Sequence, residues 1–208
     1  DTIVEENNGS YSLVELGGSI YAGGIFADGG NNSQVIVNGQ LDASSYISSG
    51  GRIVVTGEEV IIQSPAVINA SGITGGGSIE IGGGFQGNNA AVRNASVTTV
   101  EAGANIKADA IEAGNGGEVI VWADNHTEYR GQISVRGGSQ SGNGGFVEVS
   151  GKNTLDFQGL VDAAAVYGFN GKLLLDPKNI IVETGGGAAT TAVDQFSDSP
   201  SADSSISP

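Results

Sequence analysis

The first segment with the residue types for chemistry is a glycine-rich run at residues 82–87 (GGGFQG), which matches the dinucleotide-binding pattern G-x-G-x-x-G. In such a site the glycines bring the backbone close to a pyrophosphate, and a following helix points its N-terminus at the phosphates. Here two Asn and a Val- and Thr-rich stretch follow, and they do not predict a helix. In a chain with 36 glycines the match is expected by chance, so no cofactor site is predicted.

Acid-base and nucleophilic chemistry has few candidate residues. A Ser-His-Asp arrangement would have to use His126, the single His, which lies in a turn-like segment and is best interpreted as a solvated residue. Hydrolysis of a polysaccharide would need carboxylates on one face. Asp42 and Asp162 follow the same Gly-x-aliphatic pattern, but Ser134 holds that place in another copy. A solvated acidic face is favoured, and no catalytic residue is predicted.

Modification and metal sites are the remaining possibilities. The calcium-binding nonapeptide repeat G-G-x-G-x-D-x-U-x is absent, so no metal site is predicted. Five N-x-[ST] sequences are candidate glycan acceptors, although unmodified turn asparagines are the simpler interpretation. These acceptors are Asn8, Asn31, Asn69, Asn94 and Asn125.

The charge balance excludes several classes of partner. The net charge is −15, from 8 Lys and Arg against 23 Asp and Glu. Such a chain repels the phosphates of nucleic acid and the surface of an anionic membrane. No apolar run approaches the roughly 20 residues that span a bilayer, so no membrane insertion is expected. With no Cys, stability must come from burial and backbone hydrogen bonds.

A repeated pattern organises the chain and must position these residues. The sequence Gly-Gly-x-φ-x-φ, in which φ is aliphatic, begins at residues 50, 76, 116 and 144, and a weaker copy begins at residue 171. A second pattern, Gly-x-φ-x-small, begins at Gly39, Gly131 and Gly159. Each unit therefore holds about three short segments of alternating hydrophobicity, separated by turn residues. This spacing predicts an all-β right-handed parallel β-helix with about 26–28 residues per triangular coil.

Two regions depart from the repeat. The interval from Gly77 to Gly117 is 40 residues, which predicts one inserted bulge, a loop or extra strand, at residues 82–102. Residues 185–208 are rich in Gly, Ala, Ser and Asp, and this composition is typical of a linker or tail. The predicted solenoid therefore covers residues 1–184. Its ends leave coil edges unpaired, so we expect end-to-end self-association unless caps cover them.

Four segments resemble a known family. They are residues 114–124 (GNGGEVIVWAD), 127–133 (TEYRGQI), 142–152 (GNGGFVEVSGK) and 173–180 (LLLDPKNI). Over residues 103–182 the chain resembles the filamentous haemagglutinins and high-molecular-weight adhesins, which are large exoproteins of two-partner secretion. The resemblance implies export through an outer-membrane transporter and folding outside the cell. The Asn-Pro-Asn motif typical of the family's secretion domain is absent, so the segment resembles stalk downstream of that domain.

The function that follows is that of a secreted rod on the surface of a Gram-negative-type bacterium. We expect it to mediate or support adhesion to a receptor or glycan on a host or neighbouring cell, and not to be an enzyme. One alternative is the stalk of a contact-dependent toxin-delivery protein. The other is a carbohydrate-active β-helix enzyme, which would gather several carboxylates in a groove.

Overall fold

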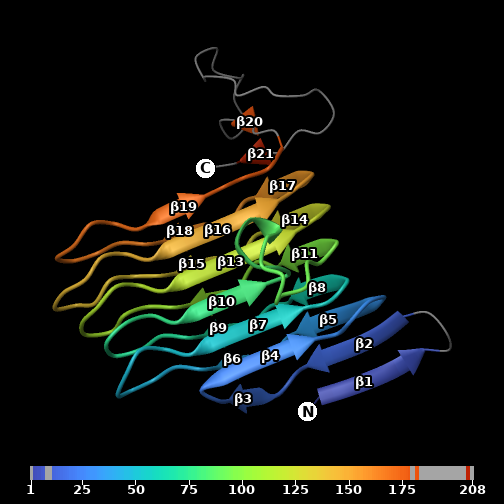
Figure 1. The fold of residues 1–208 in the computed structure, drawn as a ribbon, viewed down its shortest axis with the longest axis horizontal. Helices are drawn as coiled ribbons and strands as arrows, with labels where there is room; N and C mark the ends of the chain where they lie inside the picture. Colours follow the sequence, from blue (N-terminus) through green and yellow to red (C-terminus); the bar gives the residue numbers. More distant parts are fainter. Residues whose placement is uncertain (1, 8–10, 179–180, 183–204, 207–208) are drawn as a thin grey trace.

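The computed structural model describes residues 2–7, 11–178, 181–182 and 205–206. The fold consists of three β-sheets whose strands are stacked along one axis (Figure 1). Sheet A contains β1 (Thr2–Asn7), β2 (Tyr11–Leu16), β5 (Ser33–Val37), β8 (Glu59–Ile62), β11 (Val97–Val100), β14 (His126–Tyr129), β17 (Thr154–Phe157), β21 (Ser205–Ile206) and β20 (Ile181–Val182). Sheet B contains β3 (Ser19–Tyr21), β6 (Gln40–Asp42), β9 (Val67–Asn69), β12 (Asn105–Lys107), β15 (Gln132–Ser134) and β18 (Leu160–Asp162). Sheet C contains β4 (Gly24–Asp28), β7 (Arg52–Thr56), β10 (Ser78–Ile81), β13 (Glu118–Ala123), β16 (Phe146–Gly151) and β19 (Lys172–Leu174).

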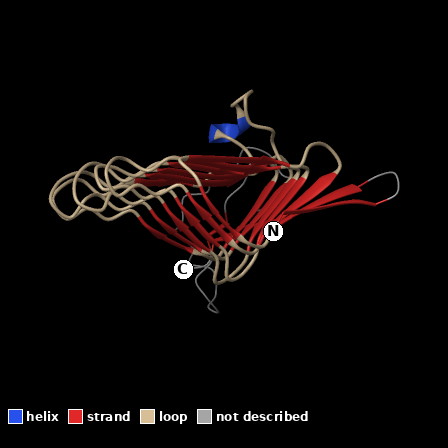
Figure 2. Cartoon of the chain, turned by 90° about the horizontal axis from the view of Figure 1, so that it is seen from below, coloured by secondary structure: helices blue, strands red, loops and turns tan. Residues whose placement is uncertain are grey.

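The chain passes from sheet A to sheet B to sheet C in each coil, and the next coil repeats this order. Figure 2, which looks along the stack, shows the three sheets enclosing one core. Equivalent strands pair in parallel, so that Ile79 lies between Ile53 and Val119. The antiparallel pair of β1 with β2 is the exception at the N-terminal end. These features confirm the predicted right-handed parallel β-helix.

The core is a column of inward-pointing aliphatic side chains that are almost all fully buried. No single coil covers this face, so stacking is what removes it from water. Near one corner two aromatic side chains take the place of aliphatic ones in the core. Tyr129 stacks on Phe157 with 5.3 Å between ring centroids. A side chain at Gly159 would collide with the ring of Tyr129, which explains the glycine at that corner.

The two sequence patterns meet at the loop that joins sheet B to sheet C. The second glycine of each pair donates its N–H to the small residue that ends the other pattern, as in Gly117 to Ala108 (2.7 Å) and Gly145 to Val135 (2.7 Å). A Cβ at Gly145 would lie 2.1 Å from the carbonyl oxygen of Gly117 in the coil below. We call this stack of second glycines the glycine ladder. It comprises Gly51, Gly77, Gly117, Gly145 and Gly171.

The inserted segment, residues 82–96, leaves the coils between β10 and β11 and lies over the outer face of sheet C (Figure 2). It contains a short 3-10 turn, η1 (Phe85–Gly87). The segment is shorter than the predicted 82–102, because residues 97–100 form the regular strand β11 between β8 and β14. The predicted tail at 185–208 lies outside the described residues, apart from β21. Within the described part of the chain, no helix is long and apolar enough to cross a membrane.

Candidate binding groove beside the inserted segment

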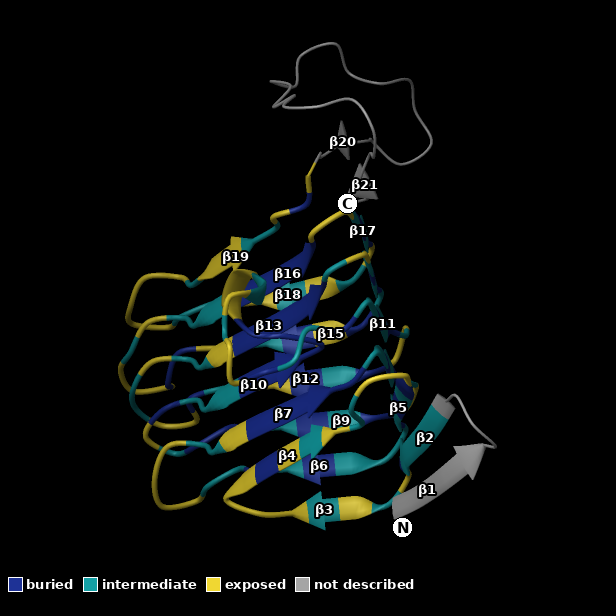
Figure 3. Cartoon of the chain, turned by 45° about the vertical axis from the view of Figure 1, so that its right-hand side comes forward, coloured by how far each residue is buried: buried dark blue, intermediate teal, exposed yellow. Residues whose placement is uncertain are grey.

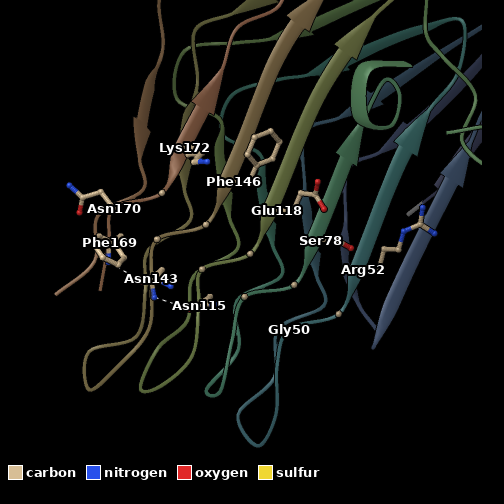
Figure 4. A pocket seen from close by; sticks show the side chains of 18 residues that line it. Gly50, Arg52, Ser78, Asn115, Glu118, Asn143, Phe146, Phe169, Asn170 and Lys172 are labelled. Carbon is tan, nitrogen blue, oxygen red and sulfur yellow. Dashed lines mark hydrogen bonds between the residues drawn. The ribbon is translucent and has the colours of Figure 1, made fainter. Parts of the chain in front are cut away.

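A groove of about 1010 Å³ runs along the stack where the chain enters sheet C (Figure 4). Its floor consists of the glycine pairs that precede the strands. The groove extends over five successive coils, from β7 to β19, which at about 4.8 Å per step makes it roughly 19 Å long. A site of this shape is suited to a linear molecule.

One wall of the groove is formed by the first residue of each sheet C strand. The strands pair in register, so these five side chains form a single row. The row mixes charges of both signs with a hydroxyl and an aromatic ring. It comprises Arg52, Ser78, Glu118, Phe146 and Lys172.

The opposite wall carries amide side chains that are fixed by the backbone of the next coil. The Oδ1 atom of Asn115 accepts a hydrogen bond from the N–H of Asn143 (2.9 Å), and the Oδ1 atom of Asn143 accepts one from the N–H of Phe169 (2.8 Å). Each Nδ2 group is left with no hydrogen-bond acceptor among the described residues. The wall therefore presents oriented donors at the spacing of the coils.

The inserted segment contacts one wall of the groove on the sheet C side. Phe85 packs edge-on against Phe146, with 5.8 Å between ring centroids. Asn89 donates to Glu80 Oε1 at 3.0 Å. Phe85 and Asn89 also line a side pocket of about 280 Å³ with three members of the row, Arg52, Ser78 and Glu118. This pocket contains the carboxylates of Glu80 and Glu118.

The inserted segment, residues 82–96, also links the coils, because its contacts reach from the first strand of sheet C to the last. We call this segment the strap. Arg93 forms an ion pair with Asp28 at the end of β4 (3.1 Å), and its carbonyl oxygen accepts a hydrogen bond from Thr56 at the end of β7. At the other end, Gln86 donates its N–H to Glu148 in β16 (3.0 Å) and its side chain to Asp176 beyond β19 (3.4 Å).

Trp122 is the centre of this strap. Its ring points outward from sheet C yet is only 4% exposed, and its Nε1 donates to Asp124 at 3.1 Å. A Cβ at Gly83 or Gly87 would lie 2.7 Å from the ring, so these two glycines let the segment lie flat on the indole. Four of the six residues in the dinucleotide-like run have positive φ, namely Gly82, Gly83, Gln86 and Gly87. Glycine is therefore required at Gly83 and Gly87 because the segment packs on Trp122. The turn η1 has only three residues, so it provides no helix N-terminus that could bind a phosphate.

Three carboxylates lie on the outer face of sheet C in different environments. Glu80 accepts a hydrogen bond from Arg52 Nε at 2.9 Å. Glu148 is fully buried, with Oε1 left without a hydrogen-bond partner among the described residues, and this burial raises its pKa despite the N–H of Gln86, with Asp176 and Glu118 adding to the rise. Partial burial, and then the charge of Glu80, raises the pKa of Glu118. The described residues contain no group of three or more His, Asp or Glu that could hold a metal ion.

The acidic positions singled out in the sequence are not brought together. Asp42 and Asp162 both point outward from sheet B, but β6 and β18 are four strands apart, or about 19 Å at 4.8 Å per step. Ser134 lies between them and hydrogen-bonds to Asp109 (2.6 Å). His126 lies at the start of β14 and shares a hydrogen bond with Thr154 (2.7 Å).

The candidate glycan acceptors differ in accessibility. Asn31 and Asn125 are exposed, and Asn69 is half-buried with its Oδ1 accepting from the N–H of Ser71. The Nδ2 group of Asn94 already donates to Gly87 (2.9 Å) and to Asp124 (3.2 Å), so attachment of a sugar there would break the strap. Asn8 lies outside the described residues.

Sequence reasoning missed Trp122, Glu80 and Glu148. Each occupies an outward position that alternation assigns to solvent. One signal was present, because the run VIVW at 119–122 is apolar at outward as well as inward positions, which is typical of a strand covered on both faces.

Comparisons with known proteins agree with the fold and with the predicted kind of family. No protein-family model and no curated protein matches the chain. Among solved structures, the chain is similar to the crystal structure of the HMW1 secretion domain from Haemophilus influenzae, with 26% identity and a TM-score of 0.60 over 79% of this chain and 49% of that chain. The chain therefore spans about half the length of that domain. The similarity supports a general role in two-partner secretion, and with it export from the cell.

Proposed function

We propose that the chain is a rigid segment of an exported cell-surface protein and that it supports adhesion to a receptor or glycan on a host or neighbouring cell. The observation that carries the proposal is the uninterrupted stack of paired coils, which places a row of loops and a long groove along one side. Similarity to a secretion domain of an exported protein supports the location. During export the partner is an outer-membrane transporter, and the exported rod lies at the cell surface.

The position of the segment within its parent protein is part of the proposal. We place it in the stalk, downstream of a secretion domain, because the Asn-Pro-Asn motif is absent. The solved structure that it resembles is itself a secretion domain. A parallel β-helix continues coil after coil with the same geometry, so both placements use the same fold.

Binding without turnover is also proposed. A carbohydrate-active enzyme needs one carboxyl group that releases a proton and a second that accepts one or attacks. Glu80 is held by Arg52 and Asn89, and Glu148 is covered by the inserted segment. Among the described residues that line the groove, Glu118 is the one exposed carboxylate, and a single carboxylate does not complete such a pair.

Adhesion is tested with beads coated with residues 1–208 and added to cultured epithelial cells and to bacterial cells. Beads coated with an unrelated acidic protein of similar net charge are the control. We expect the chain-coated beads to bind at least one cell type, and soluble chain to compete for that binding. Equal binding by the two kinds of bead, or binding that soluble chain does not compete, would refute the adhesive role.

A further inference from the structure

The groove beside the glycine ladder has the chemistry to hold a linear glycan. Its length rules out a compact ligand as the best fit, because a small molecule would contact only one or two of the five coils that line it. Repeated side chains at the coil spacing instead suit a polymer with a regular repeat.

A peptide strand is disfavoured by the hydrogen bonding of the floor. A peptide that extends a sheet needs free backbone N–H and C=O groups. The floor N–H groups are already used, since Gly116 donates to Asn143, Gly144 donates to Phe169, and Gly117 and Gly145 donate to carbonyls within their own coils. The floor is therefore smooth and offers no backbone donors.

An anionic polymer is disfavoured by charge. The chain carries a net charge of −15, and the floor has no free N–H groups with which to cradle phosphate or sulfate. Lys172 makes no ion pair among the described residues, but Glu118 stands in the same row and opposes it. A strongly anionic chain would therefore be repelled along most of the groove.

An uncharged glycan matches what remains. Its hydroxyl groups accept hydrogen bonds from the Nδ2 groups of Asn115 and Asn143, which are fixed through their Oδ1 atoms and have no partner among the described residues. Glu118 accepts from hydroxyl groups on the facing wall. Phe169, which is 84% exposed, offers an aromatic face to the apolar C–H surface of a sugar ring. Figure 4 shows these side chains along the two walls.

We propose that this groove binds a linear, uncharged glycan, with Asn115 and Asn143 as donors and Phe169 as the stacking platform. The inference rests on the proposed adhesive function and names the ligand class and the site. It assigns the recognition to one side of the rod, between the row of strand-initial residues and the loops that join sheet B to sheet C.

The test is calorimetric titration of residues 1–208 with three neutral hexasaccharides, which are cellohexaose, chitohexaose and maltohexaose. Hexagalacturonate is the anionic comparator. The informative variant is Asn115→Asp with Asn143→Asp, because it keeps the oxygen that accepts from the backbone and removes only the outward donors. Its matched control is Gln132→Glu with Asn153→Asp, which adds the same charge at exposed positions outside the groove.

We expect at least one neutral hexasaccharide to bind. The double groove variant should weaken binding roughly tenfold or more, and Phe169→Ala should weaken it roughly fivefold. The control variant should bind as the unmodified chain does, and all variants should keep their melting temperature. Binding of no neutral hexasaccharide at millimolar concentration, equal binding by the groove variant, or tighter binding of hexagalacturonate would overturn the proposal.

The bead assay separates this proposal from the adhesive function. If beads adhere but no neutral hexasaccharide binds, the adhesive function stands and the groove proposal fails. If a hexasaccharide binds but the beads do not adhere, the groove proposal stands and adhesion fails.

Discussion

The outer faces of sheet B and sheet C are built from equivalent alternating positions, yet they differ in exposure (Figure 3). On sheet B the outward residues are half-buried or exposed, and Lys107, Gln132 and Asp162 remain in solvent. On sheet C the inserted segment covers the outward residues further along the central strands, so that Ile120 is 1% exposed and Glu148 is fully buried, whereas the strand-initial Glu118 stays exposed. Strand alternation therefore decides only which residues face inward. Whether an outward residue joins the core depends on what lies over it.

The largest expected loss of stability comes from a substitution in the glycine ladder, where the chain enters sheet C. Gly145→Ala would place a Cβ 2.1 Å from the carbonyl oxygen of Gly117, and backbone cannot move aside without disturbing the stack. We expect a loss of about 4 kcal/mol or more in the free energy of unfolding, measured by urea titration. Gly23→Ala is the matched control, because a Cβ there meets no atom within 4 Å. Similar losses of stability in the two variants would contradict the requirement for glycine at the ladder positions.

The next largest loss of stability is expected from a substitution on the covered outer face of sheet C, and the exposed outer face of sheet B provides the control. Trp122→Ala should cost about 3–5 kcal/mol, because it leaves a cavity under the inserted segment. Leu160→Ala on the outer face of sheet B, where the side chain is 66% exposed, should change stability by less than about 0.5 kcal/mol. Thermal unfolding followed by circular dichroism measures both. If both substitutions destabilise the chain alike, the cover on sheet C has no energetic role.

The regular part of the fold could be predicted because each of its features has a local sequence cause. The glycine pairs are required by close approach of successive coils, and the aliphatic residues after them face the core. The strap could not be placed from sequence, because its position depends on contacts between residues far apart in the chain, such as Arg93 with Asp28 and Gln86 with Glu148. For the same reason the groove was missed: its walls come from five coils, and no continuous segment of sequence contains it.

The pH dependence of stability tests whether Glu148, on the outer face of sheet C, is buried. Burial raises the pKa of Glu148 above 4.5, so the folded chain binds this proton more tightly than the unfolded chain. This contribution to stability is fully present below pH 4.5 and is lost as the pH rises through the folded pKa. Glu148→Gln should therefore stabilise the chain at neutral pH and flatten the dependence of stability on pH.

Unfolding titrations between pH 4 and pH 8 measure this effect. Gln132→Ala on sheet B is the control, because that side chain is exposed and carries no ionisable group. Parallel profiles for the unmodified chain and Glu148→Gln would show that burial on sheet C does not affect this titration. Glu118→Gln should flatten the profile in the same direction, because the pKa of Glu118 is also raised.

The smallest expected effect concerns the arginine that ties the strap to the first coil. Arg93 is two-thirds buried, with 33% of its side chain exposed, and it contacts both Asp28 and Asn31. Arg93→Ala should cost about 0.5–1 kcal/mol, because an ion pair that is partly shielded from water retains more of its attraction than an exposed one. Arg136→Ala removes the exposed pair with Asp162 on sheet B and should cost less than about 0.5 kcal/mol. Because Arg93 holds residues 82–96 to the first strand of sheet C, Arg93→Ala should also speed proteolysis within these residues. Arg136→Ala should not, because Arg136 does not contact them. Equal cleavage rates in the two variants would mean that the strap is held without this anchor.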